Sequence, residues 1–284
     1  MDRAREGRAA ETLVDLRDVE ALRGIRSVAG GLSIGGMVTL SELARSPLAA
    51  PWRGLTATAA AVGNPAIRTV GTVGGNLLQS PRCWYFRDPH SHCLKKGGPL
   101  CHARVGDHSR HACIDLGSCL APHPSSLGVA LLAYDASVTL AHGGTWPVER
   151  FFGDGTDPRR QNAAPTGALL VSVELPGAGE HATAHLRCTA RVAGDWPDVE
   201  VVVVLSHRGG RVRQARVAAG GVATIPLRLR AVEDALVGRV PTEAVLADAA
   251  GSAARHASSP PDAAWKLRLL RGAVLVALEQ AVNE

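Results

Sequence analysis

The sequence predicts an α+β fold with two parts: mixed strands and helices first, then an antiparallel sheet with closing helices. Three observations predict it. Residues 199–205 form a nearly continuous apolar run, which is typical of a central strand. Apolar residues alternate with small or polar ones, as in a half-buried strand, at Leu169, Val171, Val173 and Leu175. Near the end of the chain, apolar residues recur at helical spacing: Leu267, Leu270, Val274 and Leu278.

Composition narrows the class of protein. The chain has 284 residues, of which 46% are hydrophobic and 20% charged, which excludes a disordered or collagen-like chain and suggests two domains. The net charge of +5 contains no Lys/Arg-rich run, so nucleic acid is not expected as a partner. No apolar run approaches the ~18 residues of a membrane span, and the first residues lack the apolar stretch of a signal peptide. We therefore expect a cytoplasmic protein with no membrane contact.

In the first half, local signals mark each expected element. Gly30 and Gly31 predict a turn, and Thr39 with Glu42 has the form of a capping box that begins a short helix through Leu43. Residues 64–76 are rich in Gly and Pro, so regular structure throughout is not expected. The other expected elements are strands over residues 13–16, 32–37 and 136–140 and helices over residues 55–62 and 127–134.

In the second half, the expected elements are a hairpin and three helices. His207 to Gly210 predicts the turn of a hairpin whose second strand covers residues 211–217. A further strand is expected over residues 185–192, and helices over residues 228–237, 241–254 and from Pro261 onward. Residues 151–165 are polar and contain several Gly and Pro residues, so we expect a linker there. The predicted domains are residues 1–155 and 165–284.

Five of the six cysteines lie within residues 83–119. In a reducing compartment, clustered thiols indicate metal or iron–sulfur ligands before disulfides. No C-x-x-C pair occurs, which argues against zinc ribbons, zinc fingers and thioredoxin-type chemistry. Four thiolates suit a [4Fe–4S] cluster or one zinc ion, and a set of unrelated buried thiols remains the alternative. Histidines that keep a mixed zinc site open are His90, His92, His102, His108, His111 and His123.

A second candidate site is the glycine-rich segment from Thr72 to Asn76. Exposed amides in such a segment can bind a pyrophosphate, although Gly-Gly pairs more often serve turns. The segment is neither a Walker loop nor a G-x-G-x-x-G fingerprint.

These motifs resemble those of a known family. The run I-R-T-V-G-T-V-G-G-N-L at residues 67–77 resembles the second flavin-binding loop of the FAD subunits of molybdenum hydroxylases, which include xanthine dehydrogenase and carbon monoxide dehydrogenase. R-C-W-Y-F-R at residues 82–87, C-L-K-K-G-G at residues 93–98 and S-C-L-A-P-H-P-S at residues 118–125 resemble the subgroup whose FAD domain carries an extra [4Fe–4S] loop, as in hydroxybenzoyl-CoA reductase and aldehyde oxidoreductases.

The resemblance implies a fold and a set of site residues. The fold is a PCMH-type FAD-binding domain over residues 1–155, with the cluster loop at residues 83–119, and a CO dehydrogenase flavoprotein C-terminal-like domain over residues 165–284. The implied cluster ligands are Cys83, Cys93, Cys101 and Cys119. Cys113 and Cys188 are left as a bystander and a core thiol. The implied FAD contacts are Arg68, Thr72, Gly74, Gly75, Asn76, Ser125, Ser126, Asp195 and Trp196, and no side chain is expected to act as acid or base.

The implied function is electron transfer. Electrons would pass between a molybdenum cofactor-binding large subunit, a [2Fe–2S] small subunit and an external acceptor or donor through FAD and the [4Fe–4S] cluster here. The sequence departs from the family in three places: Ser126 replaces an aspartate, Gly194 replaces an aromatic residue, and the N-terminal FAD subdomain with the first glycine-rich loop is expected to be missing. Two alternatives remain, an FAD-less scaffold that keeps the cluster and a zinc-stabilised interaction module.

Overall fold

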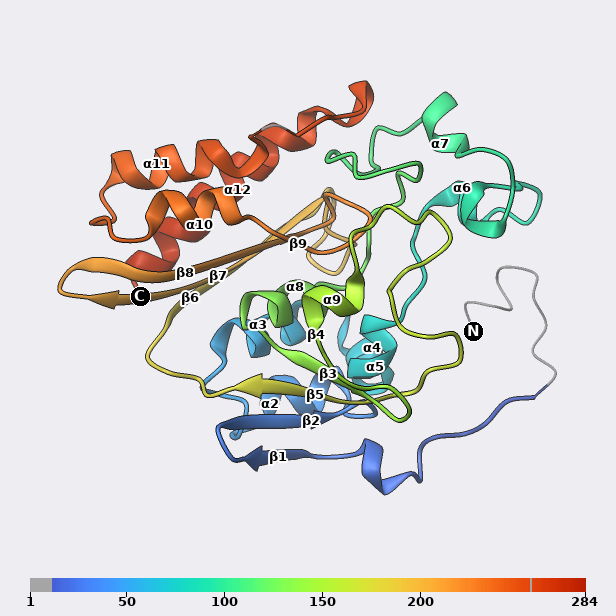
Figure 1. Ribbon diagram of the computed structural model, residues 1–284, viewed down its shortest axis with the longest axis horizontal. Helices are drawn as coiled ribbons and strands as arrows, with labels where there is room; N and C mark the ends of the chain where they lie inside the picture. Colours follow the sequence, from blue (N-terminus) through green and yellow to red (C-terminus); the bar gives the residue numbers. More distant parts are fainter. Residues whose placement is uncertain (1–11, 256) are drawn as a thin grey trace.

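A computed structural model describes residues 12–255 and 257–284 and shows the elements stacked in layers (Figure 1). The structure contains two antiparallel sheets. Helices lie between them, and three more helices cover the outer face of the second sheet. The predicted α+β class is therefore confirmed. In the described part of the chain, no helix combines the length and the apolar character that crossing a membrane requires.

The first sheet has the strand order β1-β2-β5-β3-β4, with every pair antiparallel. Ile34, Val138 and Val173 face one another on its three central strands and are fully buried. The strands are β1 (Ile25–Val28), β2 (Gly31–Gly35), β3 (Ser137–Leu140), β4 (Gly144–Pro147) and β5 (Leu170–Pro176).

β5 belongs to the first sheet, whereas the sequence-based domain boundary placed it in the second domain. The alternation at residues 169–175 correctly predicts a strand, but the second domain was expected to begin at residue 165, whereas β5 is the middle strand of the first sheet. The polar residues 153–169 therefore connect α9 to β5 within one sheet. A register shift between Thr139 and Leu140 also breaks the alternation, so that Leu170 is buried while Leu169 and Val171 are partly exposed.

The helices beside the first sheet follow their local signals in part. The capping box is confirmed: the Thr39 hydroxyl accepts from the Glu42 amide at 3.1 Å, and the Thr39 amide donates to the Glu42 carboxylate at 2.7 Å. Residues 13–16 are irregular and mostly exposed, not a strand. The helices are α2 (Leu40–Arg45), α3 (Arg53–Ala61), α4 (Pro65–Val70), α5 (Val73–Leu77), α8 (Ser126–Ala133) and α9 (Val148–Phe152).

The second sheet has the order β6-β7-β8-β9 and is covered on one face by α10, α11 and α12 (Figure 1). β7 is buried on both faces from Val199 to Leu205, which explains its continuous apolar sequence. Gly209 and Gly210 both have positive φ in the predicted hairpin turn. The elements are β6 (Ala182–Cys188), β7 (Val199–Arg208), β8 (Arg211–Gly220), β9 (Leu227–Arg228), α10 (Arg230–Leu236), α11 (Glu243–Gly251) and α12 (Trp265–Val282).

Residues 78–124, between α5 and α8, form the cysteine segment. Its regular structure consists of three single turns: α6 (Trp84–Arg87), a 3-10 turn (Leu94–Lys96) and α7 (His102–Val105). Main-chain bonds attach it to the second domain, because the amides of Cys113 and Ile114 donate to Val222 O and the amide of His123 donates to Ala223 O. The segment is therefore shared between the two sheets.

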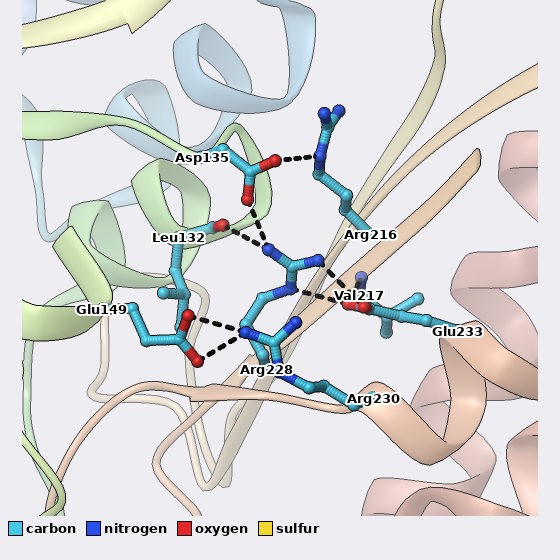
Figure 2. A network of polar contacts seen from close by, with 8 residues as sticks. All are labelled: Leu132, Asp135, Glu149, Arg216, Val217, Arg228, Arg230 and Glu233. Carbon is cyan, nitrogen blue, oxygen red and sulfur yellow. Dashed lines mark hydrogen bonds and ion pairs between the residues drawn. The ribbon is translucent and has the colours of Figure 1, made fainter. Parts of the chain in front are cut away.

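Helix α8 lies between the two sheets, and all eight of its residues are buried. Buried helix ends need partners because water cannot reach them. At the C-terminal end, the Arg228 guanidinium donates to Leu132 O at 3.3 Å and to Asp135 at 2.6 Å (Figure 2). Arg228 also makes two bonds to the buried Glu233 carboxylate, which in turn accepts from the Val217 amide. This network joins β8, β9 and α10 to the end of α8.

We predict that Arg228→Met lowers the free energy of unfolding by roughly 3–5 kcal/mol, because it leaves the Glu233 carboxylate buried without its cation. Arg230→Met is the matched control: Arg230 pairs with Glu149, and both side chains are more than half exposed, so we expect a loss below about 1 kcal/mol. Urea unfolding of the two variants measures both effects. Equal losses would show that the buried network does not hold the domains together.

Candidate functional site

Residues 64–76, in which regular structure throughout was not expected, contain two short helices separated by Gly71 and Thr72. α4 ends at Val70, and Thr72 begins α5 by accepting a hydrogen bond from the Gly75 amide at 3.0 Å. Asn64 begins α4 in the same way through the Ile67 amide. Gly and Pro here mark helix ends, and these caps let helices of five and six residues form.

Gly74 lies against the main chain that follows β2. Its amide donates to Gly36 O at 2.8 Å, and a Cβ atom at Gly74 would lie 3.0 Å from that oxygen. A Cβ atom at Gly75 would instead meet the hydroxyl of Thr72 at 3.0 Å. The contact with Gly36 therefore requires glycine at position 74, independently of any ligand.

The remaining residues expected at FAD lie in three places. Arg68 donates to Val62 O at 3.2 Å and to Gly63 O at 3.0 Å at the end of α3, and it lines a separate cavity with Gly194. Asn76 is buried; its side-chain oxygen accepts from the Ser125 hydroxyl at 2.8 Å and from the Leu127 amide at 3.2 Å. Ser126 is the first residue of α8 and is 2% exposed.

The other three expected residues line a cavity between the cysteine segment and the second domain, which we call the central cavity. It encloses about 1020 Å³ including its opening to solvent, and Ser125, Asp195 and Trp196 line it. Trp84 and Trp196 are both about two-fifths exposed, and the Arg82 guanidinium lies 4.5 Å above the Trp196 ring. Two partly exposed indole rings in a cavity of this volume suit a planar aromatic ligand.

The charges around the central cavity are mostly paired. Arg110 binds Asp198 at 3.0 Å, and Arg191 binds Asp195 at 3.0 Å. Lys266, on α12, is 1% exposed; its ammonium donates to His111 O and Gly221 O, and burial lowers its pKa to about 8. An ammonium has three donors, so one more proton is available to a group in the cavity.

His123 supplies a buried polar atom at the same cavity. Its Nδ1 accepts from the Ser125 amide at 3.2 Å, and Nε2 has no partner among the described residues. Burial lowers its pKa to about 3, so the ring is neutral at pH 7. The ring packs edge-on against Phe152, with centroids 4.8 Å apart.

The four expected cluster ligands meet at a second cavity, which we call the thiol cavity. Cys83, Cys93, Cys101 and Cys119 all line it, and each is at most 9% exposed. The Cys119 thiol donates to Cys101, which lowers the pKa of Cys101 and raises that of Cys119. Lys95 also lines the cavity, and its ammonium donates to Arg160 O at 3.0 Å.

Main-chain amides point at several of these sulfurs. The amides of Tyr85 and Phe86 bond to Cys83, and the Ala121 amide bonds to Cys119 at 3.4 Å. Burial raises the pKa of Cys83 to about 11, so without a bound cation the group is a neutral thiol at pH 7. Amide donors onto buried sulfurs are typical of iron–sulfur sites.

The other two cysteines and the histidines of the cysteine segment lie in several different places. Cys113 is fully buried against Val222 in the core of the second domain, and Cys188 lies on β6. His102 lines the thiol cavity, whereas His111 and His123 line the central cavity. Across residues 12–255 and 257–284, no three His, Cys, Asp or Glu side chains lie close enough to share one metal ion.

Sequence reasoning missed several residues of the central cavity. Lys266 had a readable signal: it lies four residues before Leu270 and therefore on the apolar face of α12. Trp84 and Arg110 lie in the cysteine segment, where no periodicity exists to show which side chains face inward. Their position depends on how the segment folds against the second sheet.

Two antiparallel sheets joined through α8, with a central cavity and a thiol cavity that share Cys83, define the class of two-domain protein to compare with known families. Residues 2–178 match the family described as FAD binding domain in molybdopterin dehydrogenase, and residues 184–277 match the CO dehydrogenase flavoprotein C-terminal domain. The chain belongs to this family of FAD-binding medium subunits of molybdenum-containing oxidoreductases.

Individual relatives agree with this assignment. The chain is 34% identical over 248 residues to the aldehyde oxidoreductase FAD-binding subunit PaoB of Escherichia coli (strain K12), covering 78% of this chain and 72% of that protein. It is 24% identical over 244 residues to the carbon monoxide dehydrogenase medium chain of Hydrogenophaga pseudoflava, covering 86% and 70%.

Solved structures share the fold. Quinoline 2-oxidoreductase from Pseudomonas putida 86 superposes with a TM-score of 0.74 at 24% identity, covering 99% of this chain and 85% of that one. CO dehydrogenase from Oligotropha carboxidovorans superposes with a TM-score of 0.70 at 23% identity, covering 94% and 81%.

We predict that Gly74→Ala lowers the free energy of unfolding by about 1–3 kcal/mol, because the new methyl group must displace the main chain at Gly36. Gly75→Ala is the control, with an expected change within about 0.5 kcal/mol, because the gain in helix propensity offsets contact with the Thr72 hydroxyl. Urea unfolding measures both. A large loss for Gly75→Ala alone would contradict the assignment of the close approach to Gly74.

Proposed function

We propose that this chain is the flavin and iron–sulfur subunit of a molybdenum-containing hydroxylase or dehydrogenase. It passes electrons between partner subunits carrying the molybdenum cofactor and a [2Fe–2S] cluster and an external acceptor or donor. The observation that carries the proposal is the adjacency of the two cavities: Cys83 lines both the thiol cavity and the central cavity. Close redox centres are what an electron-transfer subunit requires.

The central cavity fits the ring system of FAD. Trp196 and Trp84 offer apolar surface, while Lys266 offers a donor to carbonyl or ring-nitrogen acceptors. Asp195 and Ser125 complete the lining, and Asn76 holds Ser125 in place. When bound, FAD accepts or donates electrons one or two at a time, and the protein positions it. Arg68, Thr72, Gly74, Gly75 and Ser126 are proposed to contact its remaining parts.

The thiol cavity fits a [4Fe–4S] cluster. A zinc ion requires all four sulfurs within about 2.3 Å of one point, whereas a cluster presents a separate iron to each sulfur. Four buried thiols that line one cavity offer one ligand for each iron of such a cluster. Cys83, Cys93, Cys101 and Cys119 would hold it, with the amides of Tyr85, Phe86 and Ala121 directed at the sulfurs.

The remaining parts of the proposal concern partners, place and domains. We propose a large molybdenum subunit and a small [2Fe–2S] subunit as partners, and the cytoplasm as the location, because all six cysteines are free thiols. We propose that residues up to β5 form the FAD-binding domain and that the second domain begins before β6, because β5 pairs with β2 and β3.

Assays of iron, acid-labile sulfide, zinc and flavin on the purified full chain test the function, together with its visible spectrum. Iron, sulfide and flavin together support the proposal. Iron without flavin would favour an FAD-less scaffold, and zinc without iron would favour an interaction module. Either of these results would replace the proposed function.

We predict that Cys83→Ser sharply lowers the iron content and destabilises the cysteine segment, because ligand binding supplies folding energy where the core is small. Cys113→Ser is the matched control: Cys113 is equally buried in the same segment but lines neither cavity, so we expect unchanged iron. Iron analysis and limited proteolysis check both. Loss of iron in Cys113→Ser with retention in Cys83→Ser would overturn the ligand set.

A further inference from the structure

His111 lies at the wall between the two cavities. Its Nε2 is 3.3 Å from Cys83 Sγ, its ring lines the central cavity, and the residue is 1% exposed. Cys83 lines both cavities, whereas Cys93, Cys101 and Cys119 line only the thiol cavity. The histidine therefore contacts the expected ligand that is nearest to the central cavity.

The hydrogen bonds of the ring decide which nitrogen carries the proton. Nδ1 is buried and has no partner among the described residues. A proton on Nδ1 would leave an N–H without an acceptor and would turn the Nε2 lone pair toward the lone pairs of sulfur. A proton on Nε2 makes a hydrogen bond to Cys83 Sγ and leaves a single unmatched lone pair. The geometry therefore favours Nε2–H as a donor to the sulfur.

Three contacts hold His111 in this position. Its carbonyl accepts from the Lys266 ammonium at 3.0 Å, and its amide donates to His108 O at 2.9 Å. The Trp84 ring meets the imidazole edge-on, with centroids 4.5 Å apart and planes at 85°. The main chain of His111 is thus held in part by the second domain, and its ring packs against Trp84 of the cysteine segment.

We propose that His111 is a positioning residue for the iron–sulfur cluster: its Nε2–H hydrogen bond to Cys83 Sγ raises the reduction potential of the cluster. Cys83 is the expected ligand that borders the central cavity. The inference rests on the proposed function. Hydrogen bonds to ligand sulfurs stabilise the reduced, more negative state, which makes the cluster easier to reduce. This donor adds to the main-chain amides of Tyr85 and Phe86, which lower the pKa of Cys83.

The test compares the cluster potential of purified full-length variants by EPR-monitored redox titration at one pH. His111→Phe keeps a ring but removes the donor, so we expect a lower midpoint potential at unchanged iron content. His111→Gln restores an N–H of similar reach and should return the potential most of the way toward that of the unmodified chain. His207→Phe, at an exposed histidine on β7, controls for loss of a histidine elsewhere.

The outcomes separate the two proposals. An unmodified chain that holds no iron overturns the proposed cluster and this inference with it. Iron in all variants with equal potentials overturns the role of His111 alone, because a purely structural residue would change the unfolding free energy and not the potential. Should His111→Phe lose iron, His111→Asn replaces it, since its shorter amide does not reach the sulfur; a potential equal to that of His111→Gln then contradicts the proposal.

Discussion

The burial of α8 constrains the rest of the molecule. All eight residues of this helix are inaccessible to solvent, so its free amide and carbonyl groups must find partners inside the protein. At one end, Asn76 and Ser125 satisfy the amides, and at the other Arg228 reaches Leu132 O from the second sheet. Each domain thus supplies partners for the same helix, and the two sheets are held in one arrangement by hydrogen bonds that water cannot replace.

The N-terminal end of α8 also closes the base of the cysteine segment. The segment leaves after α5 and returns at the start of α8, and Asn76 and Ser125 are bonded across these two points. Gln79 adds a second closure through Pro124 O at 3.2 Å. Within the segment the apolar clusters are small, and cysteines make up half of their buried residues. If the proposed cluster is bound, it adds to the stability of the segment, while the position of the segment depends on α8.

This arrangement brings the two cavities to one shared wall. The central cavity forms where the start of α8 meets the second sheet, and the thiol cavity forms directly behind Cys83. Lys266, from the last helix, lines the central cavity, and its ammonium also donates to the main-chain carbonyl of His111 in the shared wall. In a subunit proposed to carry electrons, the chain's own residues act by position and hydrogen bonding, and none is required as an acid or base.

The sequence by itself determined the features that depend on near neighbours: the capping box at Thr39, the hairpin at Gly209 and Gly210, the buried strand β7, and the family through its motifs. It also predicted four thiols that the structure brings to one cavity. Only the tertiary structure decided that β5 joins the first sheet, that Gly74 meets Gly36, and that His111 and Lys266 reach the site. A periodic pattern reports which face of an element is buried within a few residues. The partner across that face comes from packing between segments far apart in the chain, and no local pattern records it.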